Sequence, residues 1–113
     1  MSTCAEDHLP LHPLEFRILL AVLDGPSYGL RIVEEIEARE RSVGTLYPAN
    51  LYRRIRSLLS DGLLAESSPP EGADTRRTYV LLTPLGREVA VAETARLRDL
   101  VAEAERYEVL DGS

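Results

Sequence analysis

Three prolines divide this chain, because each stands directly before a stretch whose apolar residues recur at helical spacing. They are Pro13, Pro48 and Pro84. Proline has a fixed φ angle and no backbone N–H, so a helix accepts it among its first residues and seldom further in. The three positions therefore predict three helix starts. A chain of 113 residues has room for one compact domain assembled around these helices.

Two helices are predicted in the first part of the chain. The first begins at Pro13 and stops before Gly25 and Pro26, a pair that ends helices. Its apolar positions are Leu14, Ile18, Leu19 and Leu23. Ser27 is a suitable cap for the second helix, and Gly29 near its start allows another helix to cross closely. The apolar stripe of the second helix is expected at Leu30, Val33 and Ile36.

The third helix is predicted to have two contrasting sides. It follows a segment at 43–47 with the composition of a short strand, and it begins at Pro48. At the helical period, the apolar residues share one side, and these are Leu51, Ile55, Leu58 and Leu59. The opposite side holds Arg53, Arg56, Ser57 and Ser60, with Asn50 at its edge. One side is therefore expected to pack and the other to remain free for binding.

A hairpin and a long helix are predicted for the rest of the chain. The strands span 63–67 and 75–82, and the Ser-Pro-Pro-Glu-Gly-Ala-Asp segment between them cannot pair. Thr83 then supplies a cap and Pro84 a first helical residue. The last helix has an apolar stripe at Leu97, Leu100, Val101, Ala104 and Tyr107. Because this part extends past a small domain, we expect a partner to cover the stripe, the alternative being that it folds back on its own domain.

The net charge of −6 hides an uneven distribution of charge along the chain. Residues 42–80 contain five arginines and four acidic residues, a balance of +1, whereas the remainder contains eight arginines and fifteen acidic residues, a balance of −7. The five arginines are Arg53, Arg54, Arg56, Arg76 and Arg77. Arginines concentrated on one helix and one hairpin favour contact with nucleic acid over a merely solvated surface.

Residues that support other functions are few. No serine, cysteine or histidine has the setting of a nucleophilic site, so we expect no enzyme. Cys4, His8 and His12 recur every four residues, but Pro10 interrupts any helix there, so no metal site and no cofactor are expected. A single cysteine excludes an internal disulfide, and no apolar run is long enough to cross a bilayer. We expect a cytoplasmic protein.

The predicted order of elements is that of a winged helix-turn-helix domain, mainly α-helical with a small β-hairpin and a long C-terminal helix. Four stretches carry a closer resemblance, namely Leu14-Glu15-Phe16, Gly25-Pro26-Ser27-Tyr28-Gly29, Leu51-Tyr52-Arg53 continuing to Asp61-Gly62-Leu63-Leu64, and Arg77-Thr78-Tyr79 leading into Leu82-Thr83-Pro84-Leu85-Gly86. On these stretches the chain resembles the PadR family of transcriptional regulators from about Leu11 to Tyr107. It departs from the family at Pro48-Ala49-Asn50, where a Pro-Gly-Thr type of start is usual. This departure concerns the residues that would make the first contacts with bases.

The resemblance implies a short family member that acts as a homodimer. We expect a disordered tail at 1–10, a winged helix domain at 11–82, a dimerisation helix at 83–108 and a second disordered tail at 109–113. Such a dimer would repress transcription at a pseudo-palindromic operator and be released by a small hydrophobic effector. A winged-helix module that binds another protein, and a ligand sensor with a secondary DNA role, are the alternatives.

The expected site residues follow from the helix faces and the resemblance. Contacts with DNA are expected from Asn50, Tyr52, Arg53, Arg54, Arg56, Ser57, Arg76 and Arg77. The dimer interface is expected to include Leu14, Ile18, Leu97, Leu100, Val101, Ala104 and Tyr107. Three alternatives stay open: Asn50 caps its helix, the Tyr52 ring only packs, or the hairpin arginines only balance the neighbouring acidic residues.

Overall fold

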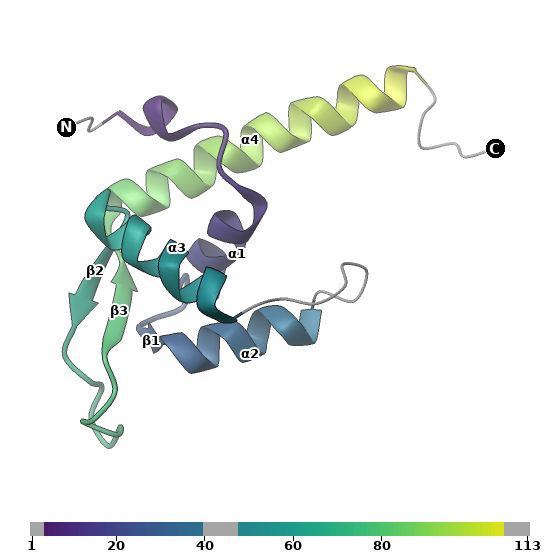
Figure 1. Cartoon of the computed structure of the whole chain (residues 1–113). Coiled ribbons are helices and arrows are strands. Elements are labelled where there is room, and N and C mark those ends of the chain that lie inside the picture. The colour runs from purple at the N-terminus through teal and green to yellow at the C-terminus, as the bar shows by residue number, and fades with distance from the viewer. Residues whose placement is uncertain (1–3, 40–47, 108–113) are drawn as a thin grey trace.

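The computed structural model describes residues 4–39 and 48–107 (Figure 1). In chain order the elements are the 3-10 helix η1 (Ala5–His8), α1 (Pro13–Ala21), β1 (Ser27–Tyr28), α2 (Gly29–Arg39), α3 (Pro48–Ser60), β2 (Leu64–Ser67), β3 (Tyr79–Leu82) and α4 (Pro84–Arg106). The helix starts predicted at Pro13, Pro48 and Pro84 are confirmed. The architecture is a winged helix with a long C-terminal helix, as predicted.

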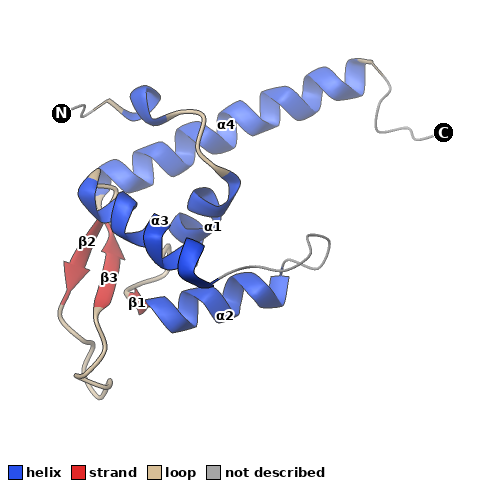
Figure 2. Cartoon of the chain, in the orientation of Figure 1, coloured by secondary structure: helices blue, strands red, loops and turns tan. Residues whose placement is uncertain are grey.

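The core lies between α1, α2, α3 and the first half of α4. Figure 2 shows α4 running along one side of the other helices and continuing beyond them, with the strands at one end. The largest core side chains that are fully buried include Ile18, Leu19, Ile32, Leu51, Leu58, Leu63 and Leu64. None of the helices in the described ranges combines the length and the apolar character that crossing a membrane requires.

The sheet contains one strand more than the predicted hairpin. Its antiparallel order is β1-β3-β2, with Ser27 opposite Val80 and Tyr28 opposite Tyr79. The prediction that Ser27 caps α2 is therefore wrong, because this residue pairs in β1 and its hydroxyl is buried. The strand predicted at 75–82 is also too long, since β3 begins only at Tyr79. The short strand predicted at 43–47 lies outside the described residues.

Side-chain caps fix the starts of α1 and α4. The His12 Nδ1 atom accepts a hydrogen bond from the Leu14 backbone N–H at 3.1 Å. The Thr83 hydroxyl accepts from the Gly86 N–H at 2.9 Å and donates to the Gly62 carbonyl at 2.6 Å. A Cβ atom on Gly86 would lie 2.1 Å from the Leu63 carbonyl oxygen, so α4 approaches the α3–β2 connection as closely as only glycine permits.

Two predictions for the N-terminal part need correction. Residues 4–10 were expected in a disordered tail, whereas η1 forms there and packs on α4, with Leu9 against the core. The stripe of α2 was expected at Leu30, Val33 and Ile36, but Leu30 is exposed and Ile32 is buried in its place. The reason is the helical period, which places Ile32, Val33 and Ile36 on one arc of α2 and Leu30 outside it.

Candidate nucleic-acid interface

Helix α3 divides into a buried and an exposed side as its sequence predicts. Leu51, Ile55 and Leu58 are 0%, 7% and 1% exposed and anchor the helix in the core. The opposite side consists of Arg53, Arg56, Ser57 and Ser60, all of them exposed. We call these four residues the basic face of α3. Because the buried side fixes the rotation of the helix, the basic face points away from the domain.

The start of α2 and the middle of α3 cross closely at Gly29 and Tyr52. A Cβ atom on Gly29 would overlap the Cε1 atom of the Tyr52 ring, so any larger residue there requires the ring to move. The close crossing expected from Gly29 is therefore confirmed. The packed ring leaves Tyr52 37% exposed at the edge of the basic face, which gives an amphipathic side chain one dry and one solvated side.

Polar side chains of α3 and α1 contact two of the arginines of α3. The Arg53 Nη2 atom donates to the Asn50 Oδ1 atom. Asn50 is the third residue of α3, so it stands inside the helix and not at the cap position. The capping alternative is therefore wrong. The Arg54 Nη1 atom lies 3.4 Å from the Glu15 Oε2 atom of α1, and both side chains are partly buried. Arg56 is exposed and has no hydrogen bond or ion pair with the described residues.

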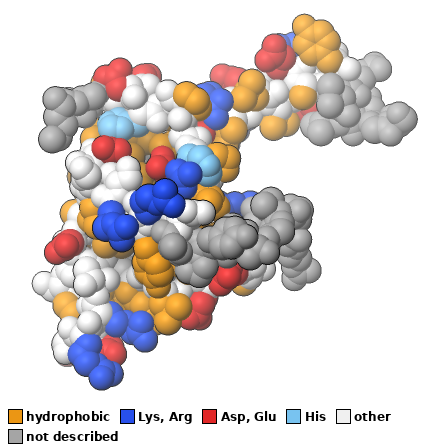
Figure 3. Space-filling model, viewed as in Figure 1, with side chains coloured by type: hydrophobic (Ala, Val, Ile, Leu, Met, Phe, Trp, Pro, Cys, Tyr) orange, Lys and Arg blue, Asp and Glu red, His pale blue; other side chains and the backbone are white. Residues whose placement is uncertain are grey.

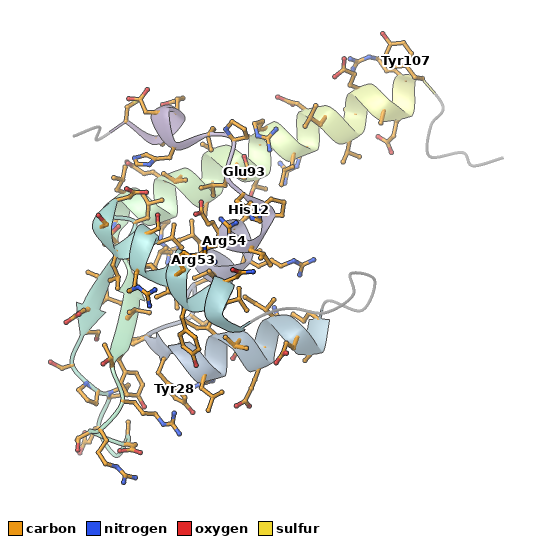
Figure 4. The ribbon with its side chains drawn as sticks, in the orientation of Figure 1. His12, Tyr28, Arg53, Arg54, Glu93 and Tyr107 are labelled. Atoms are coloured by element: carbon orange, nitrogen blue, oxygen red, sulfur yellow. The ribbon has the colours of Figure 1, made fainter. Side chains whose placement is uncertain are left out.

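A polar hollow of about 260 Å³ lies beside this part of α3. It is lined by Glu15, Asn50, Arg53, Arg54 and Ser57. The Arg54 Nε atom is buried there without a hydrogen-bond partner. Figure 4 shows Arg53 and Arg54 on α3 beside α1, with His12 at the start of α1 nearby. The hollow thus combines two arginines with polar and acidic side chains that already contact them.

The wing, which we define as residues 64–82, contributes the other two predicted arginines. The Asp74 carboxylate accepts hydrogen bonds from the Arg76 backbone N–H at 2.9 Å and from its Nε and Nη2 atoms at 3.1 and 3.2 Å. The Arg77 Nε atom lies 3.8 Å from the same carboxylate. The hydrogen bonds from the Arg76 side chain and backbone, with the charge of Arg77, hold the pKa of Asp74 below its ordinary range.

A stack of side chains connects the wing with the start of α2. The Arg77 guanidinium lies over the Tyr28 ring, 4.3 Å from its centroid. The Tyr28 and Tyr79 rings meet edge to face, with centroids 5.4 Å apart. A cation over an aromatic face is attracted by the ring quadrupole. The stack therefore positions Arg77 relative to the helices, although Tyr28 was not among the predicted site residues.

Arginines of α3 and of the wing face the same side of the molecule. Figure 3 shows arginine side chains over α3 and others near the tip of the wing, with apolar side chains between them. The structure thus brings the predicted DNA contacts of the two elements onto one surface. The sequence contained no signal for Glu15, since its contact with Arg54 joins residues far apart in the chain.

The residues expected at a dimer interface differ in how deeply they are buried, and Ala104, like Leu14 and Leu97, is intermediate. Ile18 is fully buried in the core of its own chain and is therefore removed from the interface, because it has no surface to offer. Leu100, Val101 and Tyr107 are 47%, 49% and 74% exposed on α4. Figure 4 shows Tyr107 at the far end of α4, beyond the rest of the domain. Leu14 and Leu97 are partly buried.

An apolar hollow of about 290 Å³ lies between α1 and α4. It is lined by Leu11, Pro13, Phe16, Arg17, Leu20, Glu93, Arg96 and Leu97. At its edge, the Glu93 carboxylate is 2% exposed and accepts from the Nε and Nη2 atoms of Arg96 at 2.6 and 2.9 Å. These hydrogen bonds outweigh burial and lower the pKa of Glu93. Among the described residues, no group of three or more His, Cys, Asp or Glu side chains is placed to hold a metal ion.

Comparisons with known proteins agree with this geometry. The family model described as transcriptional regulator PadR-like family matches residues 18–92. The fold is similar to that of a PadR family transcription regulator from hypervirulent Clostridium difficile, with a TM-score of 0.74 at 18% identity over 85% of this chain and 98% of the other. It is also similar to the regulator BldR from Sulfolobus solfataricus, with a TM-score of 0.69 at 23% identity over 94% and 73%.

A third solved structure is a PadR-like transcription factor from Bacteroides fragilis, with a TM-score of 0.64 at 25% identity over 83% of this chain and 88% of the other. No curated protein matches the sequence. The family match covers α2, α3 and both strands of the wing, which are the elements that carry the basic surface.

Proposed function

Because the chain belongs to the PadR-like family of transcriptional regulators, we propose that it is a cytoplasmic homodimeric repressor that binds a pseudo-palindromic DNA operator. The observation that carries this proposal is the basic face of α3, which is exposed on the same side of the molecule as the arginines of the wing (Figure 3). A net charge of −6 disfavours DNA over most of the surface, so binding is confined to this side.

On DNA, α3 enters the major groove and the wing lies along the neighbouring backbone or minor groove. Arg56 is exposed and unpaired among the described residues, so it reaches a base or a phosphate without breaking an internal contact. Arg53, three residues before Arg56, and Ser57, directly after it, lie on the same side of α3 and contact the same groove. Tyr52 and the half-buried Arg54 lie at the flank, where they contact phosphates and fix the position of the helix.

Dimerisation is supported by the continuous face that α4 presents. Gly86, Val89, Ala90 and Glu93 are buried against the chain's own domain, and Leu97, Leu100, Val101, Ala104 and Tyr107 continue the same face beyond it. A second copy that covers this stripe with α1 and α4 holds two α3 helices about 34 Å apart, which is one turn of DNA. The pseudo-palindromic operator follows from the twofold symmetry of such a dimer.

The apolar hollow between α1 and α4 supports regulation by a small hydrophobic effector. Its lining combines aliphatic and aromatic side chains with Arg17 and the Glu93–Arg96 ion pair, which is the character of a ligand site. The hollow borders the stripe that forms the proposed dimer interface. An effector that binds one arrangement of the two subunits better than the other changes the spacing of the α3 helices and lowers affinity for the operator.

The decisive experiment selects bound sequences from random DNA with the purified protein at low salt. We expect an enriched motif with two half-sites related by twofold symmetry. Arg56→Ala should weaken binding to the selected site by about tenfold or more, since a good arginine contact contributes about 1–3 kcal/mol. The control is Arg31→Ala, which removes an exposed arginine paired with Glu35 on α2 and should change affinity little.

Failure to enrich any motif at low salt would favour the protein-binding module instead. Equal loss of affinity in the Arg56 and Arg31 variants would show that only net charge matters, and the basic face of α3 would lose its assigned role. Circular dichroism of both variants should match that of the wild type, because neither side chain contributes to the core.

A further inference from the structure

Asp74 occupies the centre of a cluster of donors on the wing. Its two carboxylate oxygens are contacted by the Arg76 backbone N–H, two side-chain nitrogens of Arg76 and the Nε atom of Arg77, at distances from 2.9 to 3.8 Å. The Arg76 side chain is 89% exposed, so solvent and ligands reach the cluster freely. All of these donors therefore point at a single negatively charged group near the tip of the wing.

The same donors are suited to a phosphate. A carboxylate and a phosphodiester both present two anionic oxygens, and the planar fork of arginine binds either of them through two parallel hydrogen bonds. The surrounding structure holds the fork in place, since the Arg77 guanidinium rests on the Tyr28 ring. The wing arginine pair, Arg76 and Arg77, thus has the geometry for an anion before any DNA is present.

The arginines of α3 follow a related pattern. Arg53 donates to Asn50, and Arg54 is paired with Glu15. Of the five arginines predicted to contact DNA, only Arg56 has no acceptor among residues 4–39 and 48–107. The wing differs from α3 because one acidic residue there contacts two arginines at once, and both are exposed enough to exchange partners.

We propose that Asp74 holds the wing arginine pair in the position of a DNA backbone phosphate and competes with that phosphate for it. This inference rests on the proposed function. When DNA binds, the phosphate replaces the carboxylate as the partner of the two arginines. The carboxylate then rotates toward the solvent. Because phosphate contacts carry no sequence information, Asp74 lowers affinity for all DNA by the same factor, while the basic face of α3 determines the sequence.

The test compares Asp74→Asn with Glu71→Gln on a short DNA duplex of random sequence. Both substitutions remove one negative charge from the wing, but only Asp74 contacts the arginines, and Glu71 is exposed beside it. Asparagine keeps an oxygen that accepts from the Arg76 backbone N–H, so the turn is preserved. We expect Asp74→Asn to tighten binding about twofold to fivefold at low salt, the range of an exposed ion pair, and Glu71→Gln to change it by less than half as much.

Three further measurements separate competition from a general effect of charge. In a chain that also carries Arg76→Ala and Arg77→Ala, Asp74→Asn should no longer tighten binding, because the arginines for which Asp74 and the phosphate compete are absent. The selected operator and the random duplex should tighten by the same factor. In the wild type, the carbon NMR signal of the Asp74 carboxyl should move on addition of the duplex, which tests the replacement without any variant.

Several outcomes would overturn the inference. These are equal effects of Asp74→Asn and Glu71→Gln, an effect that persists without the two arginines, or an Asp74 signal that does not respond to bound DNA. If the wild type binds no duplex even at low salt, the proposed function fails and this inference fails with it. If the wild type binds and only the Asp74 results differ from expectation, the competition alone is wrong.

Discussion

The two halves of α4 have the same apolar pattern on one face, but this face is buried in the first half and exposed in the second. In the first half, Val89 is 0% exposed and packs into the core of its own domain. In the second half, Val101 lies on the continuation of that face and is 49% exposed, because the domain has ended and the helix has not. An apolar stripe therefore predicts burial, whereas the surface that buries it depends on what lies beside the helix.

The strongest test of this comparison places a charge in the buried half. Val89→Asp puts an unpaired carboxylate in the core and should destabilise the fold by about 4 kcal/mol or more. Circular dichroism and thermal unfolding measure the loss of helix. The matched control is Val91→Asp, since Val91 is 65% exposed on another side of the same helix. A Val89→Asp chain that melts like the Val91→Asp control would contradict the assignment of the first half to the core.

The same change in the exposed half should act on assembly and leave the fold intact. Val101→Asp introduces a charge into the proposed dimer interface twice, once from each subunit. We expect dimer affinity to fall by a factor on the order of 30 or more, since burying each uncompensated charge costs at least about 1 kcal/mol. Sedimentation equilibrium measures the dissociation, and circular dichroism should show unchanged helix content. The control variant Val91→Asp should remain dimeric. If both variants dissociate to the same degree, the apolar stripe is not part of the dimer interface.

A smaller effect is expected where the two halves meet, at Glu93. Its carboxylate is buried and accepts two hydrogen bonds from the Arg96 guanidinium. Glu93→Gln should lower the free energy of unfolding by about 1 kcal/mol at neutral pH. Because hydrogen bonds from Arg96 lower the pKa of Glu93 from its ordinary 4.5, the stabilisation is present above that pH and is lost as the pH falls through the lowered value.

Urea unfolding at neutral pH and again well below pH 4.5 measures this difference. The wild type and Glu93→Gln should converge at the lower pH, where the wild-type carboxyl is protonated. Glu103→Gln, on the exposed half of α4, serves as the control and should follow the wild type at both pH values. A difference between wild type and Glu93→Gln that stays constant with pH would rule out a role for the charge.

Sequence reasoning succeeded where neighbouring residues contain the signal. The prolines at 13, 48 and 84 predicted helix starts, and periodicity predicted both sides of α3. Prediction from the sequence failed where a segment distant in the chain determines how a residue is placed. Ser27 has the chemistry of a cap, yet its backbone pairs with Val80 in the sheet. Ile18 fits an interface stripe, yet α1 turns it fully into the core.

The starts of the helices and the basic side of α3 follow from the order of the amino acids alone, because proline geometry and the helical period act within a few residues. Only the tertiary structure decided that Glu15 holds Arg54, that Tyr28 supports Arg77, and that α3 and the wing present their arginines on one surface. Such contacts join segments that are far apart in the chain, so they exist only after the core has fixed the positions of the elements.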